Sequence, residues 1–202
     1  MKNTYNSPLS PTELQEVVEL LLLGKVGLFP TDTVYGLGCV ATSSASTLVI
    51  YRMKNRPIDK TLPLLIGGWD SFRRLAGKIR ASHRKRLEAL WPGALTVVVP
   101  ASREAISLSY HCQRNGTLAL RMPNHPQLRY VIEHLQSPIA ATSANESGRM
   151  EALSLEMVPQ AIRSRVDWAW RETIPNDEPI PSTVVDLTGK EPVVLRQGAI
   201  DF

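Results

Sequence analysis

The chain has 202 residues, of which 43% are hydrophobic and 21% are charged, and its basic residues exceed its acidic residues by 23 − 19 = 4. This composition is typical of a globular domain and excludes an intrinsically disordered chain. No apolar run approaches the roughly 18 residues of a membrane-spanning helix, and the first residues lack the core of a signal peptide. We therefore expect one cytoplasmic domain over residues 1–202, with residues 1–9 flexible and no membrane association.

The first predicted helix begins at the sequence Ser-Pro-Thr-Glu of residues 10–13, which forms a capping box with proline at the first helical position. Its apolar residues recur at helical spacing until Gly24, which ends it. Residues 26–29 are short and apolar, as in a buried strand, and Pro30 ends that strand because it lacks a backbone donor.

Polar residues follow this strand directly. Thr31, Asp32 and Thr33 place two hydroxyls and a carboxylate just beyond it. Gly36 and Gly38 come next, where the backbone can turn sharply or approach a ligand closely. Ligands in open α/β sheets bind beyond the carboxyl ends of strands. This segment is therefore either a ligand-binding loop or an ordinary polar turn.

The remaining elements alternate along the chain. Helices are predicted at residues 44–53, 69–77, 80–90, 126–135 and, despite Pro159, near 155–163. Strands are predicted at residues 62–66, 95–99, 117–122, 139–142, 166–170, 183–187 and 193–195. The alternation predicts an α/β fold with an open, twisted, mixed sheet flanked by helices. It does not predict the order of the strands in that sheet.

Several common motifs are absent. A phosphate-binding P-loop needs Ser or Thr after glycine-lysine, and the pairs at residues 24–25, 77–78 and 189–190 all lack it. Residues 36–41 match G-x-G-x-x-A, but six residues separate them from the preceding strand, whereas a dinucleotide fingerprint follows its strand directly. The histidines and cysteines lack zinc-ligand spacing, and no G-x-S-x-G elbow occurs.

A set of polar residues instead lies at predicted strand ends and loops. Each one alone fits a solvated surface group, but their repeated position beside apolar strands favours a binding site. Several cations combined with hydroxyls and amides suit recognition of polyphosphates and carboxylates. The set contains Thr31, Thr33, Lys54, Arg56, Lys60, Thr117, Arg121, Ser143, Asn145, Ser182 and Arg196.

Six segments together resemble one known family. In chain order they read P-T-D-T-V-Y-G-L-G, K-N-R-P, L-A-L-R-M-P-N-H-P, T-S-A-N-E-S-G, S-T-V-V-D and L-R-Q-G, and they extend over nearly the whole chain. The combination is similar to the YrdC-like threonylcarbamoyl-AMP synthases. The resemblance implies an open twisted sheet with a large, positively charged cavity. It also implies synthesis of threonylcarbamoyl-adenylate from L-threonine, bicarbonate and ATP, with release of pyrophosphate.

The resemblance implies a role for each matching residue. It assigns catalysis to Lys54, Arg56, Ser143 and Asn145. It assigns ATP binding to Arg56, Lys60, Thr117, Ser143 and Arg196, and threonine binding to Thr33, Arg121, Ala141 and Ser182. No protein side chain is expected to ligate a metal, since Mg²⁺ commonly binds substrate phosphates.

The resemblance also implies partners: downstream threonylcarbamoyl-transfer proteins that act on tRNA beside the anticodon.

Two positions depart from the family, because Lys60 stands where many relatives carry asparagine and Leu65 where many carry histidine. Two alternatives stay open at this point. One is a non-catalytic RNA-binding protein, supported by the basic residues between positions 73 and 86, and the other is a same-fold paralogue with a different carbamoyl or adenylate substrate.

Overall fold

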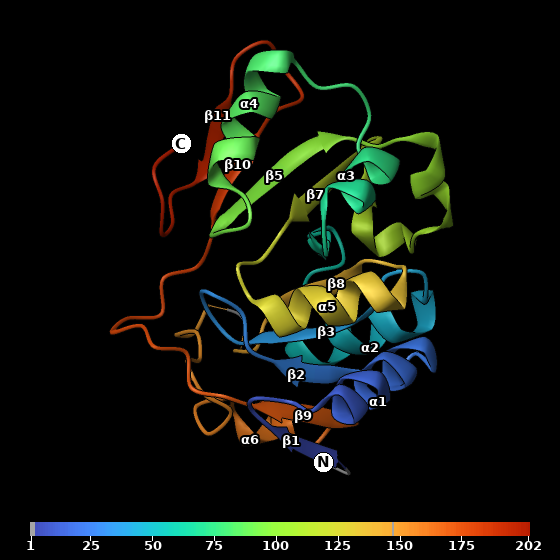
Figure 1. Ribbon diagram of the computed structural model, residues 1–202, viewed down its shortest axis with the longest axis vertical. Helices are drawn as coiled ribbons and strands as arrows, with labels where there is room; N and C mark the ends of the chain where they lie inside the picture. Colours follow the sequence, from blue (N-terminus) through green and yellow to red (C-terminus); the bar gives the residue numbers. More distant parts are fainter. Residues whose placement is uncertain (1–2, 147) are drawn as a thin grey trace.

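A computed structural model describes residues 3–146 and 148–202 and shows one mixed β-sheet with helices on both faces (Figure 1). The strand order is β1-β9-β2-β3-β8-β4-β7-β5-β10-β11, and β6 pairs with β7. The strands are β1 (Asn3–Asn6), β2 (Gly27–Phe29), β3 (Gly36–Val40), β4 (Leu64–Leu65), β5 (Leu95–Pro100), β6 (Gln113–Arg114), β7 (Thr117–Arg121), β8 (Ile139–Ser143), β9 (Trp168–Arg171), β10 (Thr183–Asp186) and β11 (Val193–Arg196). The helices are α1 (Pro11–Leu22), α2 (Ser44–Lys54), α3 (Trp69–Leu75), α4 (Ala81–Leu90), α5 (Pro126–Leu135) and α6 (Gln160–Arg163), with two short 3₁₀ helices, η1 (Arg103–Ser107) and η2 (Tyr110–Cys112).

The predicted fold class is therefore confirmed, and the clearest local signals are confirmed with it. The capping box forms at the start of α1: the Glu13 backbone N–H donates to Ser10 Oγ, and the Ser10 N–H donates to the Glu13 carboxylate at 2.8 Å. Helix α5 spans the predicted residues and begins with Pro126. Both helices bury their apolar residues at helical spacing.

Two local expectations need correction. Gly36 and Gly38 lie in strand β3, which pairs antiparallel with β2, and not in a sharp turn, although Gly36 does line the cavity described below. A Cβ on Gly36 would lie 2.6 Å from the Phe29 ring, so this glycine is required by close packing. The expected flexibility of residues 3–9 is also wrong, because β1 pairs with β9 and Leu9 is buried; residues 1–2 lie outside the described residues.

Helix α6 is shorter than expected, because it begins only after Pro159. Both cysteines are buried, and burial raises the pKa of the Cys112 thiol to about 12. Of the tryptophans, Trp168 and Trp170 are fully buried in the core. Among the described residues, no helix has the length and apolar character needed to cross a membrane.

The sheet separates two hydrophobic cores, and strand alternation assigns neighbouring residues to opposite cores. In β2, Leu28 enters the core with α2, α3 and α6, while Phe29 enters the core with α1 and α5. Figure 1 shows α1 and α5 side by side over the lower part of the sheet. The strands β5, β7, β10 and β11 extend beyond these two helices (Figure 1). A cavity lies on this part of the sheet.

Candidate active site

Cross-strand pairing aligns one side chain from each of five neighbouring strands. Leu65 of β4 pairs with Arg121 of β7, which pairs with Thr96 of β5; Thr96 pairs with Val184 of β10, which pairs with Arg196 of β11. Directly paired residues point to the same face of a sheet, so these five side chains form one row. All five line a cavity of about 220 Å³. We refer to them as the cross-strand row.

The rest of the cavity wall comes from the β2–β3 hairpin, from β7 and β8, and from the loops before β4 and β10. These residues are Thr31, Val34, Tyr35, Gly36, Arg56, Pro63, Ala119, Ala141, Thr142, Ser143, Pro181 and Ser182. The lining thus contains three arginines and several hydroxyls, and none of the described lining residues is an aspartate or a glutamate. Such a wall suits an anionic ligand.

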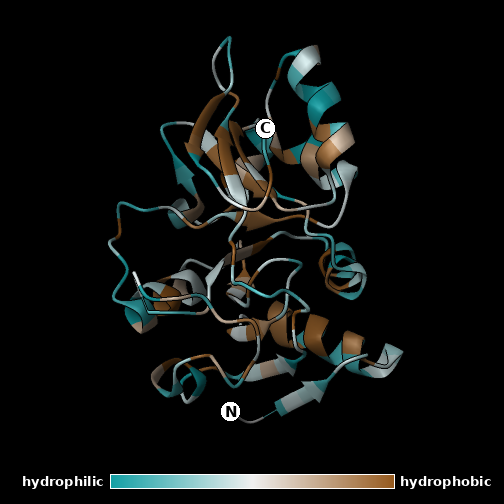
Figure 2. Ribbon diagram, turned by 90° about the vertical axis from the view of Figure 1, so that its left-hand side faces the viewer, coloured by the Kyte–Doolittle hydropathy of each residue, from teal (hydrophilic) through white to brown (hydrophobic). Residues whose placement is uncertain are grey.

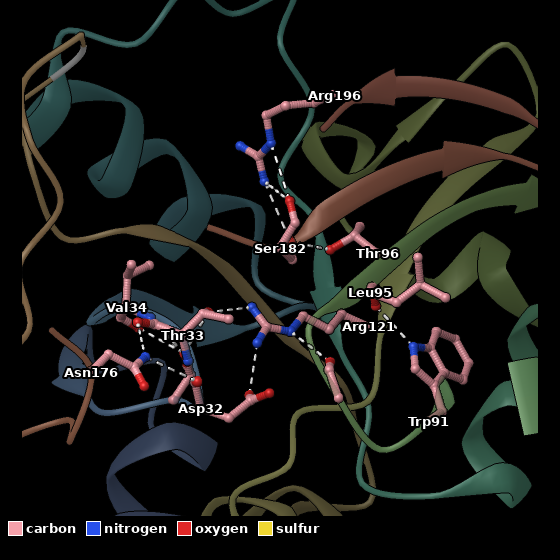
Figure 3. Close-up of polar contacts among 12 residues, drawn as sticks. Asp32, Thr33, Val34, Trp91, Leu95, Thr96, Arg121, Asn176, Ser182 and Arg196 are labelled. Atoms are coloured by element: carbon pink, nitrogen blue, oxygen red, sulfur yellow. Dashed lines mark hydrogen bonds and ion pairs between the residues drawn. The ribbon is translucent and has the colours of Figure 1, made fainter. Parts of the chain in front are cut away.

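Arg121 extends from the cross-strand row toward the loop that follows β2 (Figure 3). Its Nη2 lies 2.7 Å from Asp32 Oδ1, and its Nη1 donates to Thr33 Oγ1 at 2.8 Å. The third nitrogen, Nε, donates to the Gly93 carbonyl at 3.3 Å. Burial lowers the pKa of Arg121 and the carboxylate of Asp32 opposes that effect, so the guanidinium stays charged at neutral pH.

Lys54 and Asn145 form a second polar cluster behind the cavity wall. Lys54 Nζ donates to Asn145 Oδ1 at 3.2 Å, to Thr142 Oγ1 at 3.3 Å and to the Ser143 carbonyl. Ser143 Oγ donates to the same Asn145 oxygen at 2.6 Å. Burial, with a smaller contribution from the nearby positive charge of Arg56, lowers the pKa of Lys54 to about 8. The cluster therefore supports Thr142 and Ser143, which do line the cavity.

Ser182 and Arg196 form the opposite wall. Arg196 donates to the Ser182 carbonyl from Nη2 at 2.7 Å and from Nε at 3.2 Å, and Ser182 Oγ lies 2.8 Å from Thr96 Oγ1 (Figure 3). Gly198 holds this wall together, since a Cβ there would lie 2.3 Å from the Pro181 carbonyl oxygen. The backbone segments before β10 and after β11 can approach this closely because residue 198 is a glycine.

The structure brings most of the residues predicted from the sequence to one place. Arg56, Arg121, Ala141, Ser143, Ser182 and Arg196 line the cavity, and Thr33, Lys54 and Asn145 contact lining residues. Thr117 and Lys60 are not among the lining residues: Thr117 Oγ1 donates to the Arg114 carbonyl, and Lys60 is exposed while its carbonyl accepts from Arg56 Nε at 3.0 Å. Their ATP-binding roles stay predictions.

Sequence reasoning missed Thr96 and gave Asp32 no role of its own. Thr96 is the one hydroxyl residue in the apolar strand β5, and a lone polar residue within such a strand is a usable signal for a site. Asp32 belongs to the same loop as Thr33, but its partner Arg121 lies 89 residues away in the sequence. No local pattern reveals such a pair.

The described residues contain no group of three or more His, Cys, Asp or Glu side chains that could hold a metal ion. Mg²⁺ prefers oxygen ligands and commonly keeps water and substrate phosphates in its shell. The hydroxyls of the lining could supply at most a weak protein contact to it. These residues therefore fit a magnesium ion that arrives with the phosphates of a nucleotide.

The fold and the cavity define an α/β protein with an anion-binding site on an open sheet. A family model for Sua5, YciO and YrdC proteins, described as telomere recombination, matches residues 19–198. The chain therefore belongs to the Sua5/YciO/YrdC family, and it matches relatives that are named as enzymes.

A putative threonylcarbamoyl-AMP synthase of Mycobacterium tuberculosis is 34% identical over 178 residues, which are 88% of this chain and 80% of that protein. The crystal structure of Pyrococcus abyssi Sua5 complexed with L-threonine has a TM-score of 0.87 and 30% identity; the match covers 98% of this chain but only 57% of that one. The Escherichia coli YciO structure has a TM-score of 0.86 at 23% identity, covering 100% of this chain and 98% of that one, and supports the fold.

Proposed function

We propose that this protein is a threonylcarbamoyl-AMP synthase, which joins L-threonine, bicarbonate and ATP and releases pyrophosphate. The observation that carries the proposal is the cross-strand row, which places Arg121 and Arg196 at separate positions along one cavity. Two separate arginines suit a substrate pair with two anionic groups, a carboxylate and a polyphosphate. The names of the matched relatives, and the threonine bound to the Pyrococcus protein, support the same reaction.

In the proposed reaction the neutral amine of threonine attacks the carbon of bicarbonate, which expels hydroxide, or of carbon dioxide derived from it. The attacking nitrogen loses a proton, and a carbamate forms. A carbamate oxygen then attacks the α-phosphorus of ATP, the bond to the bridging oxygen breaks, and pyrophosphate leaves with the electron pair. No protein nucleophile is needed, so the chain's contribution is positioning and charge stabilisation. Mg²⁺ bound to the phosphates would neutralise part of their charge.

Each wall of the cavity has a distinct part in this proposal. Arg121 and Thr33, with Ser182 and Ala141, would hold threonine. Arg56, Ser143 and Arg196 would hold the nucleotide, and Lys54 with Asn145 would fix Ser143. Positive charge from Lys54 and Arg56 would stabilise the negative charge that develops as pyrophosphate leaves.

The decisive experiment is incubation of the protein with ATP, bicarbonate and a panel of amino acids, followed by pyrophosphate detection. We expect release that depends on threonine and on bicarbonate, and an adenylate product by mass spectrometry. Release that does not depend on threonine would reject the proposal in favour of a paralogue with another substrate.

The same proposal assigns the product to transfer proteins that modify tRNA, with the cytoplasm as the place of reaction. Direct RNA binding has weaker support. The basic residues between positions 73 and 86 are partly engaged within the chain: Arg73 pairs with Asp70, Arg84 with Glu88 at 3.0 Å, and Arg86 lies 4.3 Å from the Phe202 ring centroid. Most of this run lies on α3 and α4, and the outer turns of α4, at the top of Figure 2, are hydrophilic.

A further inference from the structure

Asp32 is the one carboxylate that contacts a described arginine of the cavity wall. Its Oδ1 lies 2.7 Å from Arg121 Nη2, and both side chains are nearly buried, at 7% exposed for Arg121 and 14% for Asp32. Figure 3 shows the two side chains directed toward each other from β7 and from the loop after β2. A hydrogen bond between charged groups this close is short and strongly directional.

The contacts of Arg121 determine how it can bind a ligand. A guanidinium has five N–H donors in a fixed plane. Three are used by the chain: Nε for Gly93, one on Nη1 for Thr33 and one on Nη2 for Asp32. Two donors are left, one on each terminal nitrogen. Because Nε already donates to the Gly93 carbonyl, a ligand carboxylate can bind this arginine only through the donors left on its terminal nitrogens.

The loop that carries Asp32 is itself held in place. Thr31 Oγ1 accepts from the Thr33 N–H at 3.1 Å and the Val34 N–H at 3.2 Å, which closes the loop. Asn176 Nδ2 donates to the Thr33 carbonyl at 3.3 Å and lies 3.5 Å from the Asp32 carbonyl. Asp32 is thus a fixed acceptor, able to hold a guanidinium in one orientation.

We propose that Asp32 is a positioning residue that fixes the Arg121 guanidinium so that its two remaining donors meet the carboxylate of the amino acid substrate. This inference rests on the proposed function. Asp32 is not among the residues that line the cavity. It acts through Arg121.

A negative charge beside a carboxylate-binding site has an electrostatic cost, because Asp32 also repels the substrate carboxylate. If Arg121 served as a point charge alone, removal of Asp32 would strengthen threonine binding. If Arg121 must present a defined pair of donors, removal of Asp32 weakens binding, since the guanidinium is free to rotate. The two roles therefore predict changes of opposite sign.

The experiment compares Asp32→Ala and Asp32→Asn with wild type and with Asp177→Ala, which removes an exposed carboxylate in the loop before β10. Threonine is titrated at saturating ATP, and ATP at saturating threonine. For Asp32→Ala we expect the threonine KM to rise about tenfold or more and the ATP KM to stay within about threefold. Asp32→Asn keeps an oxygen acceptor and should fall between wild type and Asp32→Ala. Asp177→Ala should match wild type.

A second readout needs no catalysis. The Nε–H of Arg121 is buried and hydrogen-bonded, so it should give a slowly exchanging signal in a ¹⁵N-resolved spectrum, identified by its loss in Arg121→Lys. We expect Asp32→Ala, or Asp32→Asn if the alanine variant does not fold, to broaden or shift this signal.

An unchanged or lowered threonine KM, or an unchanged Nε–H signal, would overturn the inference. If wild type shows no threonine-dependent pyrophosphate release, the proposed function fails, and so does the carboxylate role of Arg121. The spectrum then still decides, by itself, whether Asp32 orients Arg121. The two failures are thereby distinguished.

Discussion

Lys54 at the end of α2 donates a hydrogen bond to Asn145 Oδ1 across 91 residues of sequence. The contact joins the helix to the loop after β8, and it leaves Lys54 only 6% exposed. Lys54 is therefore a buried structural partner of Ser143 as well as a source of positive charge.

The first prediction concerns pH. Lys54 is protonated below its lowered pKa of about 8 and loses its charge as pH rises through that value. If the charge assists the reaction, kcat/KM of the wild type for ATP should fall above about pH 8 relative to that of Lys54→Met. The comparison uses kcat/KM because its pH dependence reports pKa values of the free enzyme. The ratio of kcat/KM for ATP between wild type and Lys54→Met is measured from about pH 6.5 to about pH 10, in steps of roughly 0.5 pH units. A ratio that does not change with pH would contradict the role; exposed Lys190→Met is the control.

The same lowered pKa has a consequence for stability. Between about pH 8 and 10.5 the unfolded chain keeps a proton on Lys54 that the folded protein has lost. Stability rises with pH wherever the unfolded state binds more protons. Wild type should therefore gain stability relative to Lys54→Met as pH rises through this window, measured by urea denaturation at several pH values.

Arg56 offers a cleaner test of charge than Lys54, because it is only half-buried and donates to the Lys60 and Thr61 carbonyls. We expect Arg56→Ala to lower turnover by about 10²–10³, which is the usual cost of one preorganised contact to a transition state. Its melting temperature should change little. Exposed Arg52, on the preceding helix α2, is the control, and Arg52→Ala should retain full activity. Equal turnover in both variants would remove Arg56 from the site.

Arg121→Lys keeps a positive charge but loses the planar set of donors. We expect a large rise in the threonine KM with the ATP KM within a few-fold, and loss of most threonine-dependent activity in Arg121→Ala. Because Arg121 also pairs with Asp32, a purely structural role is a real alternative. That role predicts a lower melting temperature with normal threonine saturation. Titration and melting of the same sample distinguish the two.

Arg196 should affect the nucleotide and not threonine. Arg196→Ala removes a charged donor from the wall opposite Arg121, and hydrogen bonds to charged groups contribute about 1.5–3 kcal/mol. We therefore expect the ATP KM to rise by roughly 10–100-fold. Lys190→Ala removes an equal charge outside the cavity and should have no such effect. A selective rise in the threonine KM would mean that the two ends of the cavity are assigned in reverse.

Substitution of Tyr35 tests how much the hydrogen bonds of this cavity-lining residue stabilise the fold. Its hydroxyl donates to the Trp170 carbonyl at 2.5 Å and accepts from the Glu172 N–H at 2.9 Å. Tyr35→Phe leaves both backbone groups without this partner, so unfolding should become easier by about 1–3 kcal/mol. Exposed Tyr130→Phe should stay near wild type in the same urea titration. Equal stability of the two variants would show that water replaces the Tyr35 hydroxyl.

The sequence pattern predicts those features of the structure that depend on a single strand or helix. Alternation within residues 117–122 predicts Arg121 on the face opposite Leu118 and Leu120, and the structure confirms it, with both leucines in a core. Capping chemistry likewise predicts the start of α1. In contrast, the sequence does not predict β3, because glycines are typical of turns. In the structure Gly36 and Gly38 lie in a strand, where a Cβ would be too close to the Phe29 ring.

What the sequence could not provide is the arrangement of neighbouring strands. Thr96 becomes part of the site only because β5 lies beside β7 in a register that pairs it with Arg121. The contact of Asp32 with Arg121 depends on how the loop after β2 lies over the sheet. The resemblance to a family supplied most of the site residues, but not the contacts among them.

The strand order also bears on how the protein is made. Synthesis proceeds from the N-terminus, yet β2 lies beside β9, and β5 lies beside β10. Until residues 168–171 leave the ribosome, β2 has an unpaired edge, and such edges invite association with other chains. The cross-strand row is complete only when Val184 and Arg196 have emerged. A nascent chain therefore acquires its protected sheet and its binding cavity together, late in translation, and has neither before then.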